Sequence, residues 1–294
     1  MRRRDFIRTT GMGAAFVWGA PLFSVATPVS EKTKVVVVRG RQYPAMFDRG
    51  LYELGGLSAF IHKGAMIVLK PDISCDALPD EGLTTHPQLV KHITKQCYKS
   101  KGRAVYVFDY CFDEWTKCYK NSGIERAAKD VGAKVLPGNH ELFFSEREIP
   151  GASVLPHTHL HNAFTPSCLL IDVPVLKKDP QTMIFGGLKN LTGCVCNQDL
   201  FGQHGADRRI AELLYYKKPT LTVMDAGHLL SPVPGEQAEK VLIISTDVLA
   251  ADAVACRLLG IDPFSVEHLR IASELGLGTL SEDEIEIKKI TAYN

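Results

Sequence analysis

Short apolar runs alternate with amphipathic segments along most of the chain. The runs are rich in Val, Ile and Leu, and they predict buried strands at 35–38, 65–69, 103–108, 133–136, 169–173, 220–224 and 241–244. Apolar residues at helical spacing predict helices at 44–54, 122–131, 207–216, 248–259 and 266–275, and one that begins at Pro87 with Thr85 as its cap. This alternation is typical of an α/β protein with a mostly parallel or mixed sheet and helices on both faces.

The pattern is least regular between residues 113 and 166. The chain has no internal repeat, no low-complexity tract and no clear linker. We therefore expect one α/β domain over residues 27–294, with 113–166 as the candidate inserted lobe.

The first residues resemble a twin-arginine export signal. They read Arg2-Arg3-Arg4-Asp5-Phe6-Ile7-Arg8, and no further charge follows until Glu31. A weakly apolar, glycine-diluted segment comes next, and the small residues Ser24 and Ala26 fit cleavage after Ala26. We expect residues 1–26 to be a cleaved signal, the twin-arginine machinery to be a partner, and the mature protein to be periplasmic or extracellular. Retention of this segment as a membrane anchor is the alternative.

Composition narrows the classes of function. The formal net charge is +1 at pH 7, and removal of the arginine-rich leader leaves the chain near neutrality. This balance gives no electrostatic footprint for nucleic acid, and no later segment is apolar enough to predict stable membrane insertion. The eight cysteines include no Cys-x-x-Cys spacing. That absence argues against a ferredoxin-type iron–sulfur loop, a zinc ribbon or a thioredoxin-like site.

Polar side chains recur where the predicted strands end. Ligands of open α/β sheets gather at the carboxyl ends of strands, so these residues are candidates for a shared cleft. They lie at the strand ends themselves or in the turns and loops before the next helix: Lys70, Thr85, His86, Asp109, Lys177, Lys189, Asn190, His204, Asp225 and Asp247.

Two kinds of chemistry are present in this set. The candidates for binding an anionic substrate are Lys70, Thr85, Lys177 and Asn190. The candidates for catalysis are Asp109, Lys189, His204 and Asp225, and those for ligating a divalent metal are His86, Asp225 and Asp247. Structural roles are the alternatives, because Asp109 and Asp225 also suit turns and Asp247 suits the cap of the helix at 248.

Two local groups stand apart from this set. His157, His159 and His161 alternate, which on a strand would place all three on one face; we favour a polar loop edge, or stacking of one histidine on a neighbour. Cys194 and Cys196 flank Val195, and we expect them to serve packing rather than metal ligation or redox chemistry.

An ordered set of short motifs resembles the domain of unknown function 362 family. The motifs run Val68-Leu69-Lys70-Pro71-Asp72, Thr84-Thr85-His86-Pro87, Gly186-Gly187-Leu188-Lys189-Asn190, His204, Leu221-Thr222-Val223-Met224-Asp225, Ser245-Thr246-Asp247 and Gly276-Leu277-Gly278. The resemblance covers roughly residues 35–280 and implies an α/β fold with a polar cleft at these positions. Longer members carry a ferredoxin-like cluster module, which this chain does not match.

These observations predict an exported enzyme that acts on a small anionic substrate in a cleft at the strand carboxyl ends, with a divalent metal as an option. Two alternatives stay open. One is an iron–sulfur or redox-associated protein that uses cysteines and a separate partner module. The other is a non-catalytic envelope protein that binds an anion or a cofactor.

Overall fold

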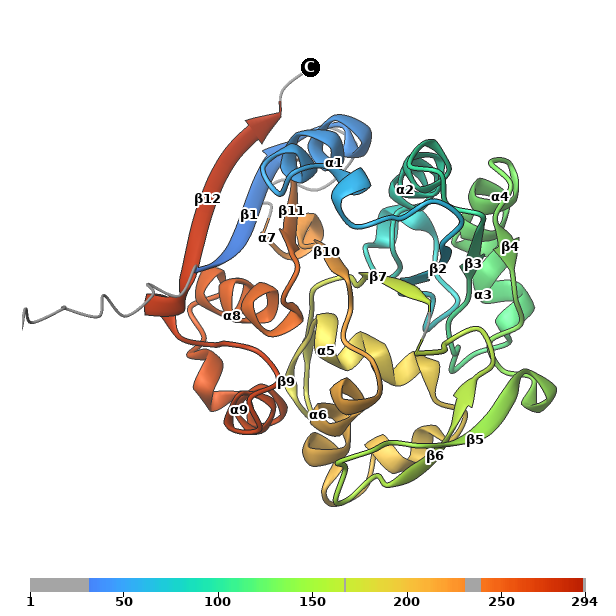
Figure 1. The fold of residues 1–294 in the computed structure, drawn as a ribbon, viewed down its shortest axis with the longest axis vertical. Helices are drawn as coiled ribbons and strands as arrows, with labels where there is room; N and C mark the ends of the chain where they lie inside the picture. Colours follow the sequence, from blue (N-terminus) through green and yellow to red (C-terminus); the bar gives the residue numbers. More distant parts are fainter. Residues whose placement is uncertain (1–31, 167, 231–238, 293–294) are drawn as a thin grey trace, which may run out of the picture. The chain divides into compact units, whose positions relative to one another are not determined.

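The computed structural model describes residues 32–166, 168–230 and 239–292. The predicted signal at residues 1–26 lies outside these ranges. The central feature is an eight-stranded sheet with the order β12-β1-β11-β10-β7-β2-β3-β4 (Figure 1). Its strands are β1 (Thr33–Gly40), β2 (Met66–Pro71), β3 (Ala104–Val107), β4 (Lys134–Val135), β7 (Leu169–Val173), β10 (Leu221–Asp225), β11 (Lys240–Ser245) and β12 (Ile285–Ala292).

All neighbouring strands pair in parallel except at β11, which is antiparallel to both β1 and β10. The mostly parallel sheet and its helices confirm the predicted fold class. The carboxyl ends of β2, β3, β7 and β10 therefore meet at one edge, whereas β11 ends at the opposite edge.

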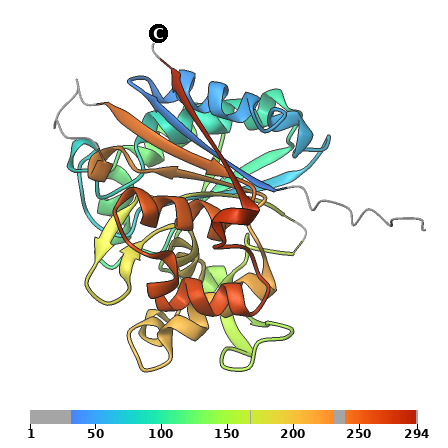
Figure 2. The same cartoon turned by 90° about the vertical axis from the view of Figure 1, so that its left-hand side faces the viewer.

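Helices cover both faces of the sheet (Figures 1 and 2). One face carries α1 (Tyr43–Tyr52), α2 (Pro87–Lys99), α3 (Trp115–Asn121) and α4 (Ile124–Lys129). The other face carries α5 (Gly187–Asn190), α6 (Ala206–Tyr216), α8 (Val248–Leu258) and α9 (Glu267–Glu274). A short helix, α7 (Gly227–Leu230), follows β10. Strand β1 shows why the apolar runs are continuous. Its Val36 and Val38 belong to the first core, which lies between the sheet and α1–α4, and its Val35 and Val37 belong to the second core, on the opposite face.

The candidate lobe at 113–166 contains elements of two kinds. Helices α3 and α4 pack into the first core, and β4 extends the main sheet next to β3. Strands β5 (Phe144–Glu148) and β6 (His157–His161) form a separate antiparallel pair. A second small pair, β8 (Lys177–Asp179) with β9 (Met183–Phe185), follows β7.

Two local predictions are wrong. The segment His157–His161 is strand β6 rather than a loop edge, because each of its residues pairs with a residue of the charged strand β5. The predicted stacking of one histidine on a neighbour is present. The rings of His161 and Phe108 lie 3.7 Å apart, centroid to centroid, with 12° between their planes. Helix α2 is capped by His86, whose Nδ1 accepts from the Gln88 N–H at 3.2 Å. Thr85 does not cap this helix, because its hydroxyl oxygen already accepts from the Asp72 N–H.

Within the described ranges, none of the helices combines the length and the apolar character that crossing a bilayer requires.

Candidate functional site

The site is built where β2, β3 and β7 end side by side. Lys70 in β2 is the register partner of Asp172 in β7, and Asp109 follows β3 on the other side of β2. All three side chains are buried, with 0%, 0% and 1% of their residue surfaces exposed. Buried ionic groups are costly unless they are paired, so this placement needs a close arrangement of partners.

Three oxygen atoms surround the ammonium group of Lys70. Its Nζ lies 2.6 Å from Asp109 Oδ1, 2.9 Å from Asn190 Oδ1 and 3.0 Å from the Pro71 carbonyl oxygen. Burial lowers the pKa of this ammonium, but the neighbouring Asp109 carboxylate outweighs that effect and raises the pKa overall. Lys70 is therefore a fixed positive charge and not a free amine.

Asp109 is held from three sides. Its Oδ2 accepts from the Ile73 N–H at 2.6 Å, and the Tyr119 hydroxyl bridges the backbone N–H and carbonyl of Asp109 itself at 2.7 and 2.9 Å. Gly193 leaves the space for the carboxylate, because an added Cβ would lie 2.0 Å from Asp109 Oδ1. Burial raises the pKa of Asp109 to about 6, against the lowering effect of Lys70.

Asn190 connects this ion pair to a second acid. Its Nδ2 donates to Asp172 Oδ1 at 2.7 Å while its Oδ1 accepts from Lys70, so the orientation of the amide is fixed. Burial raises the pKa of Asp172 well above its ordinary value. The sequence reasoning missed Asp172, although a lone acid inside the apolar run 169–173 is a usable signal.

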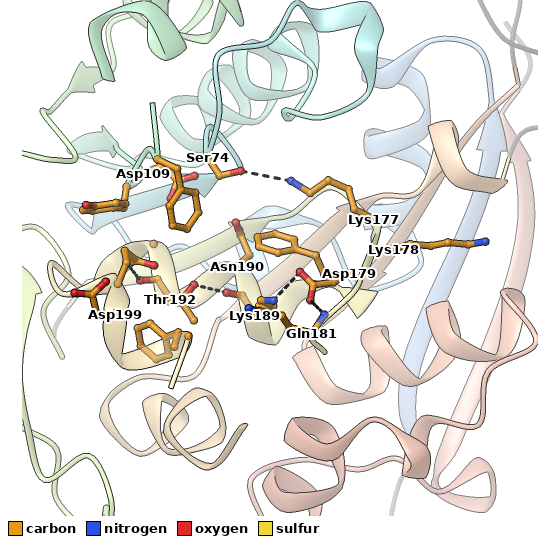
Figure 3. A pocket seen from close by; sticks show the side chains of 17 residues that line it. Ser74, Asp109, Lys177, Lys178, Asp179, Gln181, Lys189, Asn190, Thr192 and Asp199 are labelled. Atoms are coloured by element: carbon orange, nitrogen blue, oxygen red, sulfur yellow. Dashed lines mark hydrogen bonds and ion pairs between the residues drawn. The ribbon is translucent and has the colours of Figure 1, made fainter. Parts of the chain in front are cut away.

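A pocket with a volume of about 560 Å³ opens beside Asp109 (Figure 3). Figure 3 shows Asp109 and Ser74 on one side of it, and Lys189 and Asp179 on another, with Asn190 between them. Its other lining residues are Tyr110, Phe112, Lys177, Lys178, Gln181, Phe185, Thr192, Gly193, Gln198, Asp199, Phe201 and Gly202. The structure thus brings Asp109, Lys177, Lys189 and Asn190 of the predicted set to one cavity, with Lys70 directly behind.

The two predicted pocket lysines are both paired with acids. Lys177 Nζ lies 2.6 Å from Asp72 Oδ2 and donates to the Leu83 carbonyl at 3.1 Å. Lys189 Nζ lies 2.7 Å from Asp179 Oδ2 and donates to Thr182 Oγ1 at 3.0 Å. Two acceptors for three ammonium hydrogens leave Lys189 able to donate once more into the cavity.

Thr85 supports the site from behind rather than lining it. Its Oγ1 accepts from the Asp72 N–H at 2.8 Å and donates to the Val173 carbonyl at 2.6 Å. These two bonds join the loop after β2 to the end of β7. Thr85 therefore positions Asp72, the acid that pairs with Lys177, and is not itself in contact with the cavity.

Asp225 and His86 form a second, separate cluster through Tyr43, which the sequence reasoning also missed. The Tyr43 hydroxyl donates to Asp225 Oδ2 at 2.6 Å, and the Tyr43 ring stacks on His86 with a centroid distance of 4.7 Å. Burial raises the pKa of Asp225. Burial, together with nearby Lys240, lowers the pKa of His86 to about 4, so this imidazole is neutral at ordinary pH.

Asp247 and His204 are in neither group. Asp247 caps α8, accepting from the Leu249 and Ala250 N–H groups at 2.8 and 3.2 Å, and it follows β11, which ends at the opposite edge of the sheet. His204 is exposed in the loop before α6 and is not among the residues that line the cavity. The predicted metal ligands His86, Asp225 and Asp247 are therefore not brought together.

Across the ranges that the structure describes, no cluster of three or more His, Cys, Asp or Glu is suited to a metal ion. The Asp109 carboxylate also does not fit a cation, because the Lys70 ammonium already lies between Asp109 and Asn190. The eight cysteines are free thiols, and Cys194 is buried in the core as expected.

Asp252 organises the glycine-rich segment from α8. Its two carboxylate oxygens accept from the Gly187 and Leu188 N–H groups at 2.7 and 2.9 Å, at the start of α5. Gly186 has to lack a side chain, because a Cβ there would lie 2.5 Å from Asp252 Oδ1. This carboxylate therefore fixes the helix that presents Lys189 and Asn190, and burial raises its pKa to about 7.

Comparison with known proteins places these residues in a family. The family described as "Domain of unknown function (DUF362)" matches residues 67–257, a range that includes Lys70, Asp109, Asp172, Lys189 and Asn190. The chain is also 25% identical over 239 residues to the Thylakoid-associated protein sll1697 of Synechocystis sp., covering 77% of this chain and 73% of that protein. The motifs recognised in the sequence and the extent of this match agree, and the chain belongs to the DUF362 family.

Proposed function

We propose that this chain is an exported enzyme that binds a small organic anion in the cavity beside Asp109 and moves a proton to or from it through that carboxyl. The observation that carries the proposal is the buried Lys70–Asp109 pair, in which Asp109 is one of the residues that line an open pocket. A buried ion pair of this kind contributes little net stability. Its position at the wall of a cavity supports a role in chemistry.

The two members of the pair have different roles in this proposal. Lys70 has three acceptors for its three hydrogens, so it holds its proton and supplies a fixed positive charge. Asp109, with a pKa of about 6, is the group that exchanges a proton near neutral pH. Asn190 keeps the ammonium aimed at Asp109 while the carboxyl changes charge.

The charges around the cavity favour an anion once Asp109 is protonated. Three lysines and three aspartates line the pocket. Protonation of Asp109 removes one negative charge from this lining, and Lys189 has a hydrogen left to donate to a ligand. Binding of an anion and uptake of a proton by Asp109 should therefore support each other.

Export is proposed on the leader alone. Its arginines, its uncharged stretch and the small residues before Thr27 support cleavage after Ala26. Expression in a host with a twin-arginine pathway, followed by mass spectrometry of the envelope fraction, tests this step. A mature N-terminus at Thr27 is expected. Full-length protein that stays in the cytoplasm would contradict it.

Calorimetry tests the pocket. Inorganic phosphate and benzoate are titrated into the mature protein at pH 6.5 in two buffers of different ionisation enthalpy, which measures proton uptake together with affinity. We expect binding with proton uptake, weakened about tenfold in Lys189→Met by loss of one charge-assisted hydrogen bond. Lys91→Met removes an exposed lysine that pairs with Asp130 on another face and is the matched control. Binding that is unchanged in Lys189→Met, or that takes up no proton, contradicts the proposal.

A further inference from the structure

Aromatic rings line the same cavity as the lysines. They belong to Tyr110 and Phe112 in the loop after β3, to Phe185 in β9 and to Phe201 before α6. Phe112 is the most unusual of them, because 71% of its surface is exposed. At the wall of the pocket, this exposed ring is available to contact the apolar part of a bound ligand.

Backbone hydrogen bonds fix the position of the loop that carries Phe112. The Phe112 N–H donates to the Ser74 carbonyl at 2.8 Å, and the Tyr110 N–H donates to the Gly193 carbonyl at 3.2 Å. The two rings meet edge to face, with centroids 5.9 Å apart and planes at 70°. Together they form an aromatic corner beside Asp109, the residue that directly precedes Tyr110.

The lysines lie around another ring. Lys177 Nζ is 4.3 Å and Lys189 Nζ is 6.0 Å from the centroid of Phe185. The Lys189 ammonium therefore lies near an aromatic ring that also lines the cavity. An anionic group at Lys189 would bring the rest of its molecule against aromatic walls.

We propose that the ligand of this cavity is an aromatic anion, with its carboxylate or phosphate at Lys189 and its ring against the aromatic corner of Tyr110 and Phe112. This inference rests on the proposed function and narrows it to a class of compound. The cavity volume of about 560 Å³ is in the range of pockets that enclose a ring-bearing molecule. Edge-to-face and stacked contacts favour a planar π system over a saturated ring of similar area.

Matched pairs of ligands test the inference in the mature protein. Benzoate is compared with cyclohexanecarboxylate, and phenyl phosphate with cyclohexyl phosphate, by calorimetry at pH 6.5. The aromatic member of each pair should bind roughly three- to tenfold more tightly. Phe112→Ala should remove this preference, and it should fold because the side chain is exposed. Leu142→Ala, which truncates another exposed apolar side chain that is not a lining residue, is the control.

The outcomes separate the two proposals. Equal affinities within both pairs, or a preference that persists in Phe112→Ala, would overturn the aromatic inference and leave the anion site standing. A failure of all four compounds and of phosphate to bind would overturn the proposed function and the inference with it.

Discussion

Two carboxylates buried beside a cation, Glu212 in α6 and Asp109 after β3, have opposite environments. Glu212 is 0% exposed, and its oxygens accept from the Ser153, Val154 and Leu155 N–H groups at 3.0, 2.9 and 2.8 Å and from Arg208 at 2.7 Å. Burial raises the pKa of Glu212, but these donors outweigh it and lower the pKa to about 2. Asp109 has Lys70 and a single backbone donor, and its pKa is raised to about 6.

The difference separates an acid that holds the fold together from one that can exchange protons. Glu212 fastens the loop at 153–155 to α6, and its charge is fully satisfied at every physiological pH. Burial makes ionisation of Asp109 unfavourable, and Asp109 borders a cavity. The larger number of hydrogen-bond donors at Glu212 and the deeper burial of Asp109 together distinguish the two acids.

Removal of Lys70 should have the largest effect. Lys70→Met leaves the Asp109 and Asp172 carboxyls buried without a cation, and breaking such a pair costs about 3–5 kcal/mol of unfolding free energy. Urea denaturation should show a larger loss at pH 8 than at pH 5, because Asp109 is protonated at the lower pH. Adding Asp109→Asn to the variant should restore part of the loss. A loss that does not depend on pH and is not rescued would contradict this account of the pair.

Glu212→Gln should cost about 2 kcal/mol at pH 7, the order expected for hydrogen bonds to a charged group. The folded pKa of about 2 lies below the ordinary value, so the charge stabilises the fold above about pH 4.5 and the benefit is lost as pH falls toward 2. The variant and the wild type should therefore converge in acid. Glu267→Gln, at an exposed ion pair with Arg270, is the control and should change little. A difference that persists unchanged at pH 3 would show that Glu212 does not act through its charge.

Asp247→Ala should have the smallest effect, about 1 kcal/mol, which is the usual loss for a helix cap. Asp247→Asn keeps an acceptor and should recover most of it. Neither change should alter phosphate or benzoate affinity, because Asp247 is at the edge of the sheet away from the cavity. A drop in phosphate or benzoate affinity in both variants, measured by calorimetry, would show that Asp247 does contribute to the binding site.

The sequence predicted most strands of the sheet, and from the ends of those strands it predicted part of the site. Continuous apolar runs such as Val35–Val38 are buried on both faces, so they are readable without tertiary information. Strand β12 was missed because two lysines separate Ile287 from Ile290, which breaks the alternation of apolar and polar residues that marks a strand. The strand-end rule found Lys70 near the end of β2 and Asp109 just after β3, and these two strands are parallel neighbours.

The rule failed where it needed the direction and order of the strands. Asp247 follows β11, whose antiparallel run sends its end to the other edge of the sheet, and no local pattern reveals that reversal. Asp225 ends β10 on the correct edge, but it accepts a hydrogen bond from Tyr43 of α1, a partner 182 residues away. Hydrogen bonds between distant segments of this kind depend on the assembled fold.

Carboxyl-carbon NMR of the wild type against Asp109→Asn tests the central claim most directly, because the difference spectrum isolates the Asp109 signal. A titration midpoint at about pH 6, which moves upward when benzoate or phosphate is bound, is the predicted result. A midpoint at or below 3.8, the ordinary aspartate value, would contradict it. So would a midpoint that a bound anion leaves in place.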